Sequence, residues 1–164
     1  MNLSDYLLPQ EGLDWSRILS PWGRLLPDEV TVWFANRFGE PFLVTQEGAV
    51  HRLNVELGEL ERLAESREDF ALRVDGVGVA QDWFMTPMVD AAEQAGLKLE
   101  AGQCFGFAVP TVLGGAYDVE NVRVKSMAEY HAFLAALHDK IKDLPDGTEI
   151  QLHFEDEDED QAPR

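Results

Sequence analysis

The sequence has little cysteine and no long apolar run. Cys104 is the only cysteine among 164 residues, which excludes a disulfide within the chain and fits a reducing compartment. No apolar stretch approaches the roughly 20 residues that a membrane-spanning helix needs. The first residues, Met1–Asp5, lack the basic and apolar regions of a signal peptide. We therefore expect a cytoplasmic protein.

Basic residues are also scarce. Lys and Arg number 13 against 31 Asp and Glu, so the formal net charge is −18. This balance argues against nucleic acid as a direct partner, because phosphate binding needs a basic face. It also argues against binding to an anionic membrane surface. A hydrophobic content of 45% is nevertheless too high for a disordered chain.

The chain divides into three parts by composition. Residues 1–28 hold two Trp and many Leu between prolines, and we expect this segment to pack onto the domain, with Asp14 capping a short helix over Trp15–Leu19. Residues 29–154 are expected to form one domain. Residues 155–164 begin with six consecutive acids and should be a disordered tail. The tail contributes −5, which leaves −13 for the rest of the chain.

The first half of the domain has the pattern of strands. Val30, Val32 and Phe34 alternate with other side chains, and further strands are predicted at 42–45, 49–55 and 59–64. Loops this short join antiparallel neighbours, so this half should be a meander. A helix over 59–64 is the alternative, because Leu60 and Leu63 are three residues apart.

The second half is more helical. One helix is predicted after a capping box at 66–69, and another from a capping box at 126–129 onward. A third is predicted between them, with Thr86 as N-cap, Pro87 as first helical residue, Ala95 as its end and Gly96 as its C-terminal cap. Strands are predicted at 103–109, 121–125 and 149–154. The sequence thus predicts a single α+β domain, an antiparallel or mixed sheet with helices packed mainly on one side.

No catalytic or metal-binding signature stands out. His131 and His138 are seven residues apart on the last predicted helix, too far for one metal ion, and are expected on a partly exposed flank. Cys104 lies in an apolar strand and is expected to be a buried, inert thiol. Carboxylates such as Asp118 and Glu120 are too abundant to mark an acid–base pair. We therefore predict no catalytic residue, cofactor or metal.

One segment, residues 102–121, is unusual because five glycines lie among apolar residues ahead of Asp118 and Asn121. Gly114-Gly115 permits a sharp turn. The segment is either a plain strand–turn–strand or a shaped surface loop that holds a partner. For the second possibility, the contact residues would be Thr111, Leu113, Gly114, Gly115, Tyr117 and Asp118.

Several motifs together resemble a bacterial family first catalogued as a domain of unknown function and now described as the C-terminal domain of type VI secretion immunity proteins. They are the 102–121 segment, 142–147 after the last helix, and upstream 36–39, 48–53 and 63–67, so the resemblance runs from about Leu25 to Phe154. The chain departs from the family at Pro110-Thr111, where consecutive prolines are common, and in its acidic tail.

The resemblance implies a small α+β protein with no known catalytic residue or cofactor, similar to antidotes that bind and neutralise a DNase toxin. An acidic protein would be steered toward the basic cleft of such a toxin. We therefore expect a non-enzymatic immunity protein with a basic protein partner. The alternatives are a regulatory domain binding a small molecule or peptide, which would need a deep pocket under Pro110–Gly115, and an uncharacterised hydrolase.

Overall fold

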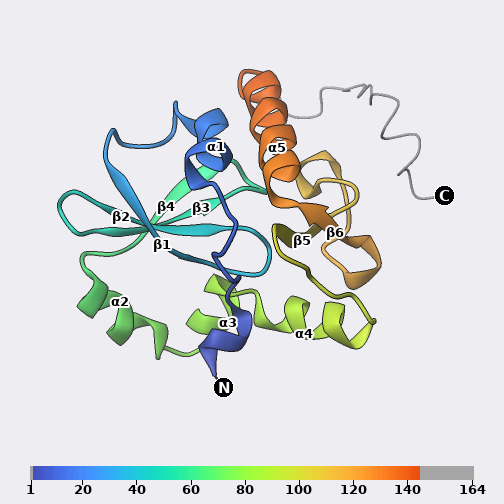
Figure 1. Ribbon diagram of the computed structural model, residues 1–164, viewed down its shortest axis with the longest axis horizontal. Helices are drawn as coiled ribbons and strands as arrows, with labels where there is room; N and C mark the ends of the chain where they lie inside the picture. Colours follow the sequence, from blue (N-terminus) through green and yellow to red (C-terminus); the bar gives the residue numbers. More distant parts are fainter. Residues whose placement is uncertain (1, 145–164) are drawn as a thin grey trace.

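The computed structural model describes residues 2–144, so the strand expected at 149–154 and the tail at 155–164 lie outside the described residues (Figure 1). The chain starts with a 3-10 turn at Leu3–Tyr6 (η1), helix α1 (Trp15–Leu19) and a second turn at Ser20–Trp22 (η2). Four strands follow: β1 (Val30–Ala35), β2 (Pro41–Thr45), β3 (Val50–Asn54) and β4 (Glu59–Ala64). They pair antiparallel in sequence order, which confirms the meander and excludes the helical alternative for 59–64.

The second half contains most of the helical residues. Helices α2 (Arg67–Val74), α3 (Val79–Trp83) and α4 (Thr86–Gln94) follow one another, and strands β5 (Gln103–Phe107) and β6 (Val122–Ser126) then form a separate antiparallel pair. Helix α5 (Met127–Ile141) follows β6 directly. Helix α3 was not predicted, because five residues after Gly78 carry no capping signal. None of the helices within residues 2–144 is long and apolar enough to cross a membrane.

The helix ends show which local signals were correct. Asp14, Ser66 and Ser126 cap α1, α2 and α5 through their side chains, as predicted. At the end of α4 the amide of Leu97 donates to Ala92 and that of Gly96 to Glu93, the hydrogen-bond pattern of a glycine C-cap.

Two capping predictions were wrong in detail. Asp69 does not reach back to Ser66, because its carboxylate accepts from the amide of Glu65 and the guanidinium of Arg73. The N-cap of α4 is Met85 at φ +52°, with Thr86 as the first helical residue. Thr86 is buried, so its side chain belongs to the packed interior instead of capping the helix.

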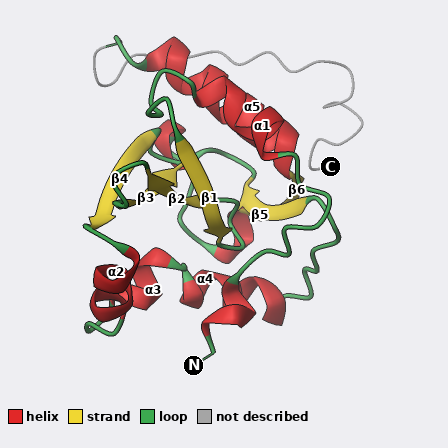
Figure 2. Ribbon diagram, turned by 60° about the vertical axis from the view of Figure 1, so that its left-hand side comes forward, coloured by secondary structure: helices red, strands yellow, loops and turns green. Residues whose placement is uncertain are grey.

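Helices cover both faces of the four-stranded sheet (Figure 2). Leu43 and Leu53 pack with residues of α1 and α5, whereas Phe42 and Val44 pack with residues of α2 and α3. Neighbouring side chains of a strand point to opposite faces, so β2 supplies both layers. The α+β class is confirmed. The sequence predicted helices mainly on one side of the sheet, whereas the structure has helices on both faces.

The two histidines of α5 are buried, not partly exposed. His131 and His138 have exposed fractions of 0% and 5%. The indole nitrogen of Trp22 donates to Nδ1 of His131 at 3.0 Å, and Nε2 of His131 lies 2.7 Å from the carbonyl oxygen of Gly39. A carbonyl only accepts, so His131 is neutral and protonated on Nε2. The prediction failed because residues 1–28 cover this flank of α5.

Candidate protein-binding surface

The 109–121 loop joins β5 to β6 and is closed by the side chain of Asn121. The amide of Val109 donates to Oδ1 of Asn121 at 3.0 Å. Nδ2 of Asn121 donates to the carbonyl oxygens of Val109 at 2.9 Å and Ala116 at 2.8 Å. One amide side chain at the end of the loop thus satisfies three backbone groups, two at its beginning and one in its middle. These hydrogen bonds give the loop a defined backbone path.

Gly114 and Gly115 each meet a steric demand of this loop. Gly114 has φ +93°, where a side chain is strained. A Cβ on Gly115 would overlap the carbonyl oxygen of Val109. The backbone at Gly115 can therefore approach the backbone at Val109 only because residue 115 has no side chain. The amide of Gly115 donates to the carbonyl oxygen of Pro110 at 3.1 Å.

Glu56 fastens the loop to the body of the domain. This residue follows β3 and is 9% exposed. Its Oε1 accepts from the backbone amide and the hydroxyl of Thr111, both at 3.0 Å. Its Oε2 accepts a hydrogen bond from the hydroxyl of Tyr130 on α5. Hydrogen bonds to a charged acceptor are stronger than neutral ones, so Glu56 fixes where the loop stands relative to β3 and α5.

Tyr130 connects the same anchor to β5. The amide of Phe107 donates to its hydroxyl at 3.2 Å, and its ring lies against Gly106, where a Cβ would clash with the ring. Burial and the charge of Glu56 raise the pKa of Tyr130, which therefore stays a neutral donor. The glycine in β5 thus makes room for the ring that positions Glu56.

A second buried polar cluster contains Glu40 and Arg52, whose side chains are nearly inaccessible to solvent. Nε and Nη2 of Arg52 contact Oε1 of Glu61 at 2.8 and 2.6 Å, and Nη1 donates to the backbone carbonyl of Asp82 at 2.9 Å. Asn36 donates to Oε1 of Glu40 at 2.9 Å, while the Arg52–Glu40 distance is 3.9 Å. Arg52 therefore ties β3 and β4 to the C-terminal end of α3.

Burial raises the pKa of Glu40 to about 7, against the opposing effects of Arg52 and Asn36. The phenol of Tyr117 is influenced by the charges of Glu40, Asp82 and Arg52, and burial together with the two carboxylates raises its pKa. Tyr117 of the loop therefore lies within electrostatic range of this cluster.

Sequence reasoning missed Glu40, Arg52 and Glu56. A signal existed for one of them: Arg52 is two residues after Val50 on β3, so both side chains occupy the same buried face of the strand. The bond between Glu56 and Thr111 joins residues 55 positions apart, which no local pattern reveals.

The six predicted contact residues all lie in the 109–121 loop but differ in exposure. Thr111 and Leu113 are half-buried, with Thr111 bound to Glu56 and Leu113 packed against the core. Gly114 and Gly115 shape the turn. Tyr117 is 62% exposed, Asp118 is exposed, and two further apolar side chains of the loop, Val109 and Val112, are also exposed. The loop thus presents apolar and acidic groups together.

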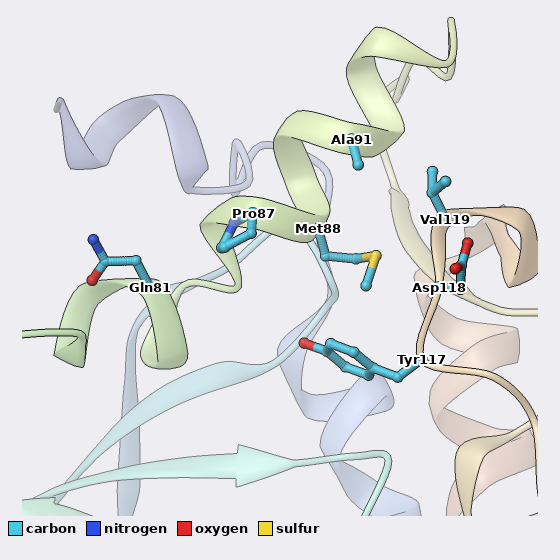
Figure 3. A pocket seen from close by; sticks show the side chains of 7 residues that line it. All are labelled: Gln81, Pro87, Met88, Ala91, Tyr117, Asp118 and Val119. Carbon is cyan, nitrogen blue, oxygen red and sulfur yellow. The ribbon is translucent and has the colours of Figure 1, made fainter.

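An open hollow of about 340 Å³ lies between α4 and the end of this loop (Figure 3). It is lined by Gln81, Pro87, Met88, Ala91, Tyr117, Asp118 and Val119. This hollow is not the pocket under Pro110–Gly115 that the small-molecule alternative predicts. It lies beside residues 117–119, whereas Thr111 is hydrogen-bonded to Glu56.

Cys104 and Asp118, the other groups considered for chemistry, are held in structural roles. Cys104 is fully buried, and burial raises the pKa of its thiol, which disfavours the nucleophilic thiolate. Asp118 accepts from the amide of Glu120 at 3.0 Å and so caps a 3-10 turn at Val119–Asn121 (η4). Among the described residues no three His, Cys, Asp or Glu side chains are grouped as a metal site would need.

Fold and surface together define a small α+β protein that presents a rigid, partly apolar loop with acidic groups. The sequence model of the family described as T6SS immunity protein Tdi1, C-terminal, matches residues 64–138, from the end of β4 into α5. This match confirms the resemblance to type VI secretion immunity proteins and includes the whole 109–121 loop. The motifs at 36–39, 48–53 and 142–147 lie outside the matched range. The matched range takes up slightly less than half of the 164-residue chain.

No curated protein matches the chain. Among solved structures, the chain is similar to the crystal structure of Atu4351 from Agrobacterium tumefaciens, with a TM-score of 0.52 and 20% identity. The similarity covers 73% of this chain and 61% of that one, so the chain spans about three fifths of its length. At this identity the similarity concerns the fold alone.

Proposed function

We propose that the protein is a non-enzymatic immunity protein that binds and neutralises a basic, nuclease-type toxin in the cytoplasm. The family match over 64–138 is the observation that carries this proposal. The 109–121 loop, which lies inside the match, is the surface that we assign to toxin binding. Immunity requires only that the toxin's working surface be covered, so the proposal assigns no catalytic step to any residue.

The rigidity of the loop supports this assignment. Asn121 closes the loop from within and Glu56 fastens it to the body, so little conformational freedom remains to be lost on binding. Its exposed apolar residues, Val109, Val112 and Tyr117, offer area that binding would remove from water. Aromatic anchors of this kind often dominate the energy of an interface.

Charge supports the choice of partner. The net charge is −18, and −13 remains without residues 155–164. A nuclease presents a basic cleft to phosphates, and an acidic protein approaches such a cleft faster than a neutral one. The association rate should therefore fall steeply as added salt screens charges beyond about 10 Å at 0.1 M ionic strength.

The test is co-expression with nuclease-type toxins of type VI secretion systems, starting with any that a neighbouring gene encodes. Growth restored by the wild-type protein, together with a complex on gel filtration, supports the proposal. Growth arrest despite co-expression, with no complex, overturns it. An immunity protein from an unrelated toxin pair, expressed at the same level, controls for effects of expression alone.

A further inference from the structure

We propose that the hollow between α4 and the 109–121 loop binds the guanidinium side chain of an arginine from the protein partner. This inference rests on the proposed function, because it names the chemistry by which a basic toxin would engage this surface. Two walls face each other across the hollow, and Gln81 of α3 lines it as well. The α4 wall is Pro87, Met88 and Ala91, and the loop wall is Tyr117, Asp118 and Val119 (Figure 3).

Size and wall chemistry fit one long side chain. A volume of about 340 Å³ lies at the low end of the roughly 300–1,000 Å³ of small-ligand pockets. The α4 wall is apolar and suits the aliphatic stem of an arginine. The ring of Tyr117 packs on Phe107 at a centroid distance of 5.5 Å, which supports it as a fixed aromatic wall for a planar cation.

The charge around the hollow selects a cation. The lining includes Asp118 and no Lys or Arg, and Asp82 follows the lining residue Gln81 and raises the pKa of Tyr117. Oδ1 of Asp118 accepts from the amide of Glu120, which holds the carboxylate in place at the rim.

Guanidinium fits these features better than ammonium. It is planar, stacks on aromatic faces, and is more weakly hydrated than the compact ammonium of lysine. Its five donors in a rigid fork can pair with the Asp118 carboxylate through two parallel hydrogen bonds. The hollow therefore prefers arginine over lysine, and arginine strongly over its neutral isostere citrulline.

The experiment is an NMR titration of the ¹⁵N-labelled full chain with Nα-acetyl-arginine amide. We expect saturable shifts of amides in 81–91 and 117–119, and an affinity at least tenfold higher than for the citrulline analogue and severalfold higher than for the lysine analogue. Shifts of equal size with citrulline, binding of lysine as tight as that of arginine, or shifts scattered over the acidic surface would each overturn the proposal.

Two variants and a control localise the site. Asp118→Asn keeps the capping oxygen but removes the charge, and should weaken the arginine probe at least fivefold. Tyr117→Ala removes the aromatic wall and should weaken it similarly. Asp75→Asn changes an exposed acid at the end of α2 and should leave binding unchanged. Loss of affinity in Asp75→Asn equal to that in Asp118→Asn would overturn the assignment.

The outcome separates this inference from the proposed function. If a toxin is bound and neutralised while the arginine probe is not bound, the hollow is not the arginine site and the immunity role stands. If the probe binds while the toxin does not, the site stands and the immunity role fails.

Discussion

Glu56 holds Thr111 through two hydrogen bonds to a single carboxylate oxygen, one from the backbone amide and one from the hydroxyl, each 3.0 Å long. The two residues are 55 positions apart, and the bond joins the segment after β3 to the beginning of the 109–121 loop. The same carboxylate accepts from Tyr130 on α5. The shape of the proposed binding surface therefore depends on a residue outside that surface.

Replacing Glu56 should loosen the loop. Glu56→Ala leaves the amide of Thr111 and the hydroxyl of Tyr130 without this acceptor, and we expect a loss of about 1–3 kcal/mol in the free energy of unfolding. Amide exchange at Thr111 and Gly115 should accelerate at least tenfold. Glu59→Ala, at an exposed position of β4, is the control. Unchanged exchange in Glu56→Ala would show that the carboxylate does not hold the loop.

The two loop glycines should respond differently to substitution. Gly115→Ala forces a Cβ into the carbonyl oxygen of Val109, so the loop must open. Gly114 has φ +93° with open space around it, so Gly114→Asn, a residue that tolerates this conformation, should cost less than about 1 kcal/mol. Toxin affinity and the amide chemical shifts of the loop, measured for both variants, test this difference. Equal effects would contradict the steric account.

Trp22→Phe should destabilise the domain while keeping most of the packed volume. The substitution removes the indole donor and leaves Nδ1 of the fully buried His131 unpaired. An unsatisfied buried acceptor costs about 1–3 kcal/mol, and the loss should appear in urea unfolding. Trp15→Phe is the matched control, because its indole donates to Gln10 at an exposed site. A loss no larger than in Trp15→Phe would contradict the role of this hydrogen bond.

Glu40 and His131 should make opposite contributions to the pH dependence of the free energy of unfolding. The pKa of Glu40 is raised from 4.5 to about 7, so its favourable contribution is complete below pH 4.5 and is lost as pH rises through about 7. Burial lowers the pKa of His131 from 6.5 to about 4, so its contribution is complete above pH 6.5 and is lost as pH falls through about 4. Between pH 4.5 and 6.5 the two effects largely cancel.

Glu40→Gln removes the titration of Glu40 and leaves that of His131. Relative to the wild type, the variant should gain stability as pH rises from 4.5 to 7, by roughly 3 kcal/mol at about 1.4 kcal/mol per pKa unit. Urea unfolding of both proteins across this pH range provides the measurement. A stability difference that does not change with pH would mean that Glu40 titrates near its ordinary value.

Local features of the fold were readable from the sequence, and long-range ones were not. The caps at Asp14, Ser66 and Ser126 depend on contacts within three residues, so their patterns predicted α1, α2 and α5. The burial of His131 and His138 depends on Trp22 packing across α5 from residues more than 100 positions away. Helical periodicity alone could not distinguish that covered flank from an exposed one.

The candidate site was predicted in part. Gly114-Gly115 and Asn121 lie in one short segment, and their residue types indicate a shaped loop. Glu56 and the Glu40–Arg52 cluster depend on how β3 pairs with β4 and on where the loop returns to the body. These relationships arise from strand register and tertiary packing, which a single sequence does not specify.

The central claim is that the 109–121 loop binds the toxin. Its most direct test is the dissociation constant for the toxin that co-expression identifies. This constant is compared between a loop double variant, Val112→Ser with Tyr117→Ala, and a control double variant, Leu72→Ser with Val77→Ser. Both pairs replace exposed apolar side chains, but the control pair lies at 72–77, outside the loop. We expect the loop variant to bind at least tenfold more weakly and the control to bind like the wild type. A loop variant that binds as tightly as the wild type would contradict the claim.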